Sequence, residues 1–143
     1  MVRLVLMTAC IAATAGPSAA QGLRPLAEAV ETAAHPYGPA RCAGLYQAVM
    51  EWVGHDRMGA QAWATADTSR ETMILFSAVI AQSIGGGTFE AQLENTVRGV
   101  RNIADLYLAR MEQNYASSGH AFGEDALIQA DLMFCKSAVE ALQ

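Results

Sequence analysis

The chain has 143 residues, of which 52% are hydrophobic and 16% charged, a composition that fits one folded domain and excludes an intrinsically disordered chain. Nine Lys and Arg residues against 14 Asp and Glu residues give a net charge of −5 at pH 7. An acidic chain without a basic run lacks the positive charge that nucleic acids and anionic membranes attract. We therefore expect no nucleic-acid partner. Abundant alanine and scattered β-branched residues favour helix over sheet.

The first twenty residues predict a secretory signal peptide. Arg3 supplies the positive start, and residues 4–15 form an apolar stretch that is too short to anchor the chain in a bilayer. Small residues then precede a cleavage site, which we place between Ala20 and Gln21. Two alternatives stay open. The segment before Cys10 loosely resembles a lipoprotein box, in which this cysteine would carry a lipid, or the leader remains as an uncleaved helix.

Cleavage after Ala20 would leave one mature domain, residues 21–143. Because the leader carries one arginine and no acidic residue, its removal takes the net charge from −5 to −6. No stretch of the mature chain is apolar enough to span a membrane. We expect this domain to be soluble and either periplasmic or secreted.

The mature chain begins with a short predicted helix and then a strong one. Pro25 suits the first position of a helix over residues 26–34. The segment 35–39, which contains two prolines and a glycine, ends this helix. The first main helix spans residues 39–53, because Cys42, Leu45, Val49 and Trp52 recur at helical spacing. Residues 54–66 are consistent with either a loop or a further helical turn.

A second main helix is expected to begin near Asp67, where residues 68–71 fit a capping box. Residues 73–81 are apolar almost all round, which predicts that this helix is the most buried of the fold. Three successive glycines, residues 85–87, end it.

Two further helices complete the predicted fold. The third main helix spans residues 89–116 and is capped by Thr88, with an apolar stripe at spacings of three and four that includes Val100, Ala104 and Tyr107. The fourth spans residues 124–142 and begins with two carboxylates, which suit the helix dipole. Its stripe consists of Ile128, Leu132, Cys135, Val139 and Leu142.

The two cysteines of the mature chain predict a disulfide. Cys42 and Cys135 lie on the apolar stripes of the first and last main helices, and an exported protein meets an oxidising compartment. Such a bridge stabilises the fold by roughly 4–5 kcal/mol on a chain-entropy estimate. The alternative is two free buried thiols. The expected fold is all-α: a four-helix up-and-down bundle with a short extra N-terminal helix, tied by this disulfide.

No pattern in the chain predicts catalysis or a cofactor. Glu51, His55 and Asp56 are close in sequence, yet neither an H-E-x-x-H nor a Cys-x-x-Cys motif accompanies them. Ser118 and His120 are neighbours near the end of a helix, but no nucleophile elbow is present. The carboxylates Glu124, Asp125 and Asp131 are explained as helix cap and solvated face. We therefore predict no catalytic, metal-binding or cofactor-binding residues.

The remaining hypothesis is a non-enzymatic binding or interaction module that works outside the cytoplasm, with an unknown protein as its possible partner. Aromatic residues near the predicted helix ends either anchor such a partner or seal the bundle, and Phe122 is expected to be the most exposed of them. The alternative function is a metal or haem carrier built in the bundle core.

Overall fold

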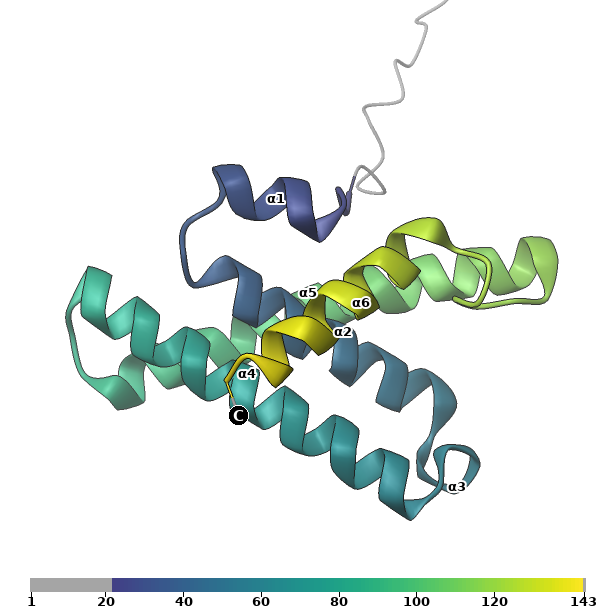
Figure 1. Ribbon diagram of the computed structural model, residues 1–143, viewed down its shortest axis with the longest axis horizontal. Helices are drawn as coiled ribbons and strands as arrows, with labels where there is room; N and C mark the ends of the chain where they lie inside the picture. The colour runs from purple at the N-terminus through teal and green to yellow at the C-terminus, as the bar shows by residue number, and fades with distance from the viewer. Residues whose placement is uncertain (1–21, 143) are drawn as a thin grey trace, which may run out of the picture.

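The computed structural model describes residues 22–142, and Figure 1 shows their arrangement. The predicted signal peptide, its cleavage pair Ala20–Gln21 and Cys10 lie outside the described residues. Within residues 22–142 all regular structure is helical, which confirms the predicted class. No helix in this part of the chain is both long and apolar enough to cross a membrane.

Six helices form the fold. They are α1 (Leu26–Thr32), α2 (Tyr37–Val53), α3 (His55–Met58), α4 (Ala60–Gly85), α5 (Phe89–Ser118) and α6 (Ala126–Glu140).

Helix α2 is the centre of the molecule and contacts each of the other five helices (Figure 1). Its residues 41–45 are all buried, so it has no solvated face over this turn. Gly44 allows the closest approach, because a Cβ atom there would lie 2.5 Å from Cγ2 of Ile103 and 3.1 Å from the carbonyl oxygen of Val100, both on α5. The backbones of α2 and α5 therefore pack more tightly than any larger residue would permit.

Cys42 and Cys135 lie at disulfide distance, with their Cα atoms 5.3 Å apart. Both side chains are buried, and they connect α2 with α6 as the apolar stripes predicted. The more specific arrangement, a four-helix up-and-down bundle, is not confirmed. Helix α6 lies against α1, α2 and α4 rather than along its predecessor α5, which it reaches only through side chains.

Residues 55–58 and 60–66 are helical, so the predicted start of a helix at Asp67 is wrong. Gly54 and Gly59 adopt positive φ angles of 77° and 81° and separate α2, α3 and α4 from one another. After Gly59 the chain continues with four alanines and Gln61 within seven residues, which favour helix, and α4 begins at once. The capping-box pattern at residues 68–71 lies inside this helix, where the Ser69 hydroxyl donates to the Thr65 carbonyl at 2.9 Å.

The prediction that α4 is the most buried helix is also wrong. Met73, Ile74, Ser77 and Ala78 face the core. On the opposite face Leu75, Phe76 and Val79 are 49%, 39% and 52% exposed. A helix that is apolar on all sides has no periodicity to show which face is covered, and here only one face is.

Local capping chemistry fixes the ends of α5 and α6. The Thr88 side chain accepts a hydrogen bond from the amide of Ala91, and Asp125 accepts from the amides of Leu127 and Ile128. Both caps were predicted and are confirmed, as is the end of α4 at the three glycines. Asp125 also pairs with Arg110 of α5 at 2.6 Å, which holds the loop before α6 against that helix.

Candidate functional site

Two features stand out in the described part of the molecule: a polar network sealed in the core and a groove open to solvent. The sealed one consists of Arg41 on α2, Tyr107 on α5 and Asp131 on α6. Arg41 donates from Nη2 to Oδ2 of Asp131 at 2.5 Å and from Nε to the Tyr107 hydroxyl at 2.8 Å. The Tyr107 hydroxyl in turn donates to the same carboxylate oxygen at 2.6 Å. The three side chains therefore satisfy one another in a closed triangle.

The second oxygen of Asp131 extends this core network to the N-terminal helix. It accepts a hydrogen bond from the amide of Leu26, the first residue of α1, at 2.6 Å. Burial raises the pKa of Tyr107, and its hydrogen bond to Asp131 raises it further, so the phenol remains a donor. Arg41 and Tyr107 are completely buried and Asp131 is 1% exposed. Because no ligand can reach them, their role is to join α1, α2, α5 and α6.

The interpretation of Asp131 as part of a solvated face is therefore wrong. Its position contained a usable signal: Asp131 lies three residues after Ile128 and four before Cys135, inside the apolar stripe of α6. Arg41 likewise precedes the buried Cys42. The apolar stripes of α2 and α6 meet at the cysteine pair, and each carries one charge, of opposite sign. This pattern indicates a buried ion pair, because an unpaired buried charge is very costly.

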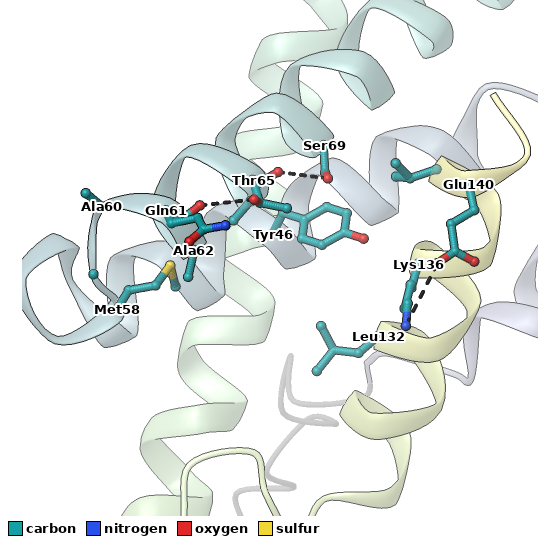
Figure 2. A pocket seen from close by; sticks show the side chains of 13 residues that line it. Tyr46, Met58, Ala60, Gln61, Ala62, Thr65, Ser69, Leu132, Lys136 and Glu140 are labelled. Atoms are coloured by element: carbon teal, nitrogen blue, oxygen red, sulfur yellow. Dashed lines mark hydrogen bonds and ion pairs between the residues drawn. The ribbon is translucent and has the colours of Figure 1, made fainter. Parts of the chain in front are cut away.

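The open arrangement is a groove of about 1000 Å³ between the N-terminal half of α4 and helix α6, which Figure 2 shows from close by. We call it the α4–α6 groove. One wall consists of Met58 and the small side chains of α4, including Ala62 and Ala66, and the other contains Leu132 and Val139 of α6. The α4 wall leaves space in front of it because its side chains are short.

The hydroxyl groups of the α4 wall are turned back onto their own helix, whereas Gln61 adds a side-chain amide to the lining. The Thr65 hydroxyl donates to the carbonyl of Gln61 at 3.0 Å, and the Ser69 hydroxyl donates to that of Thr65. Both hydroxyls are therefore satisfied, and the wall presents mostly carbon to the groove. On α6, Lys136 and Glu140 form an exposed ion pair at 3.9 Å on the edge of the groove.

Tyr46 is the lining residue that comes from the central helix α2. Its ring lies between the two walls, and its hydroxyl points towards α6 (Figure 2). Burial raises the pKa of this phenol, and the negative charge of Glu140 raises it further, so the hydroxyl stays protonated at neutral pH. The groove thus combines largely apolar walls with the neutral hydroxyl of Tyr46 and the side-chain amide of Gln61.

Polar side chains are few in this lining. Besides the Lys136–Glu140 pair, it contains the hydroxyls of Tyr46, Thr65 and Ser69 and the amide of Gln61. Since Thr65 and Ser69 donate to carbonyls of their own helix, the groove offers a ligand apolar surface removed from water, the Tyr46 hydroxyl and the Gln61 amide.

The residues considered for a metal site do not gather. Glu51 pairs with Arg101 of α5 at 2.6 Å. His55 packs its ring against Trp63 with the centroids 5.3 Å apart, and its Nδ1 atom lies 3.5 Å from Asp56. Among residues 22–142 no three His, Cys, Asp or Glu side chains come together as a ligand set. The metal or haem carrier therefore stays a prediction without a located site.

The other loop residues are placed as follows. The Ser118 hydroxyl donates to the carbonyl of Asn114 at 3.0 Å. The Nε2 atom of His120 lies 3.8 Å from Oε1 of Glu124. Phe122 is half-buried and packs against the core, so the expectation that it is the most exposed aromatic is wrong. Tyr115 is the exposed one, and it meets Trp52 edge-on with centroids 5.8 Å apart.

No protein-family model, curated protein or solved structure matches this chain. Of the groove residues, Leu132 and Val139 were expected on the apolar stripe of the last helix, whereas nothing in the sequence singled out Tyr46. Its role at the groove depends on where α4 begins, which the sequence pattern misplaced.

Proposed function

We propose that this chain is an exported, non-enzymatic binding protein that holds an uncharged, largely apolar small molecule in the α4–α6 groove. The observation that carries the proposal is the combination of an open apolar groove of about 1000 Å³ with the Tyr46 hydroxyl directed into it. A volume of this order accommodates a ligand of drug-like size, and apolar walls with one or two polar groups are typical of such sites.

The charges at the groove favour a neutral ligand. Lys136 and Glu140 lie one helical turn apart on α6 and offset each other, so neither a carboxylate nor an ammonium group gains a net partner. Tyr46 offers a hydroxyl that donates to an ether, ester or carbonyl oxygen. The expected ligand is therefore an apolar body with one hydrogen-bond acceptor.

The helices that carry the groove are fixed to the centre of the molecule. Helix α6 is held to α2 by the Cys42–Cys135 pair and by the contact of Asp131 with Arg41. Helix α4 packs along α2 over its own buried face. A site whose walls do not have to be ordered on binding avoids that entropic cost, which supports a binding role.

Export is supported by the sequence and by the cysteines. The leader of residues 1–20 predicts secretion, and a disulfide persists in oxidising compartments. The Cys42–Cys135 pair at disulfide distance is consistent with a periplasmic or secreted location. Cell fractionation with an intact-mass measurement of the isolated protein tests this part of the proposal, because cleavage after Ala20 and a closed bridge each change the mass.

The binding role is tested with a neutral apolar dye such as Nile red and with two matched variants. Ala66→Trp fills the groove, whereas Ala109→Trp places the same side chain at an exposed position of α5. We expect the first variant to weaken dye binding at least tenfold and the second to leave it unchanged. Equal binding by both variants, with both folded by circular dichroism, would refute the groove as the site.

A further inference from the structure

A second feature of α4 lies outside the groove and has no role in the proposed function. From Thr72 to Phe89 the chain contains no charged residue, which is a run of 18 residues in an acidic protein. Within this run α4 has an outer face whose centre is Leu75, Phe76 and Val79, and all three are exposed. We call residues 72–83 on this side the α4 outer face. A patch of this kind on a helix indicates an interaction surface.

The charge of the protein favours a second copy of the same chain as the partner. In a two-fold symmetric interface each side chain lies near its own image, so any charge on the surface meets the same charge. All 23 Lys, Arg, Asp and Glu residues of the chain lie outside residues 72–89, so pairing through this run brings no like charges directly together. A basic partner protein would bind more strongly to the acidic surface than to this uncharged face, so the uncharged face does not favour such a partner.

The order of residues on the α4 outer face is self-complementary in an antiparallel arrangement. A two-fold axis between Ser77 and Ala78 places Phe76 opposite Val79 of the second copy. The same axis places Leu75 opposite Ile80, and Thr72 opposite Ser83. The centre of the pairing is then apolar, and each end is closed by a pair of hydroxyl-bearing side chains.

The apolar surface also continues beyond α4 on one side. Phe76 lines a smaller cavity of about 350 Å³ between α1, α2, α4 and α6, together with the exposed Val30 and Leu142. The only titratable side chain in its lining is His35. The uncharged part of α4 is about 21 Å long. Because each partner of a stable dimer buries roughly 800 Å², the interface must include this neighbouring surface as well as α4.

We propose that the chain forms a symmetric homodimer through antiparallel pairing of the α4 outer faces. The groove uses residues 58–69 of this part of the chain, and the dimer uses residues 72–83. Each of the two proposals can therefore be tested and refuted without the other. In the dimer the exposed apolar side chains of α4 are covered by their counterparts, while both grooves remain open at the other half of the helix.

Sedimentation of the protein over a concentration series tests the dimer. The variant Val79→Glu places a carboxylate at the centre of the pairing, and Leu106→Glu makes the same kind of change at a position of α5 that is 44% exposed. We expect Val79→Glu to raise the dimer dissociation constant at least tenfold and Leu106→Glu to leave it unchanged. A wild-type protein that is monomeric up to about 1 mM overturns the proposal, because association would then be weaker than that concentration.

A mixing experiment tests the register. Phe76→Arg and Val79→Glu each disfavour self-pairing, but when mixed they place an arginine opposite a glutamate, so a one-to-one dimer should form again. Because Phe76 is the least exposed of the three central residues at 39%, Thr72→Arg mixed with Ser83→Glu provides a milder pair at the ends of the face. Circular dichroism establishes that each variant is folded. If neither mixture of folded variants restores a dimer, the proposed pairing is wrong.

Discussion

The substitution Asp131→Asn separates the charge of the core network from its shape. The amide has nearly the volume of the carboxylate, so packing is kept while the charge is removed. Arg41 then remains buried without the anion that it contacts at 2.5 Å. The Tyr107 hydroxyl and the Leu26 amide also lose a charged acceptor, which each approaches to 2.6 Å.

The expected cost of this change is large because Arg41 has no route to water. Removing one partner of a buried ion pair typically costs 3–5 kcal/mol, since the other charge is left uncompensated. The free energy of unfolding of a single domain is about 5–15 kcal/mol, so the variant should lose a substantial part of its stability. Urea unfolding of the oxidised protein at neutral pH measures this difference through the shift of the midpoint.

Two comparisons make this result interpretable. Tyr107→Phe removes only the hydroxyl of the network, and we expect a loss of about 1–3 kcal/mol. Asp105→Asn breaks the exposed pair with Arg101 at 3.1 Å, and we expect a loss below about 1 kcal/mol. If Asp131→Asn costs no more than Asp105→Asn, then Arg41 is not sealed from solvent and the network does not join the helices as described.

Three further predictions concern the disulfide, the cap of α6 and the contact between α2 and α5. Replacing both Cys42 and Cys135 by serine should lower the free energy of unfolding by roughly 4–5 kcal/mol in urea, whereas an unchanged midpoint would show that no bridge forms. Burial opposes the ionisation of Asp125, but its hydrogen bonds outweigh burial and hold its pKa below the ordinary value. The stability that ionised Asp125 supplies is therefore present above about pH 4 and is lost as the pH falls through this lowered pKa. Asp125→Ala should cost about 1 kcal/mol at neutral pH and flatten the acid limb of a pH titration of stability; an unaltered limb would contradict this. Gly44→Ala should destabilise the protein by about 1–3 kcal/mol because the added Cβ clashes with α5. Gly99→Ala should stabilise its helix slightly, because a Cβ there meets nothing within 4 Å. Thermal melts that rank the two variants the other way would refute this packing.

The parts of the fold that could be predicted are those set by short-range chemistry. Thr88 and Asp125 cap helices through hydrogen bonds to amides two or three residues away, so the local sequence contains the whole interaction. The run of glycines at residues 85–87 ends α4 for a similarly local reason. The two cysteines could be placed because each lies on a regular apolar stripe, and stripes from different helices meet in the core.

The start of α4 could not be predicted because two local patterns compete. Residues 68–71 have the spacing of a capping box, yet nothing in residues 60–66 stops a helix that is already under way. The outcome depends on Gly59, whose positive φ ends α3 and directs the chain into α4. The groove depends on the same residue, since Ala62 and Ala66 face α6 only because the helix begins early.

The apolar character of α4 is explained once its three sides are separated. One side packs on the core through Met73 and Ala78, a second lines the groove through Ala62 and Ala66, and the outer face carries Leu75. A helix with one covered side normally shows a period of 3.6 residues in its hydrophobicity, and superposing three apolar sides removes that period. An all-apolar helix in the centre of a fold needs no further explanation. At the edge of this fold, beside the central helix α2, the same composition leaves apolar surface exposed to water, which is the physical reason to expect a ligand on one side of α4 and a second chain on the other.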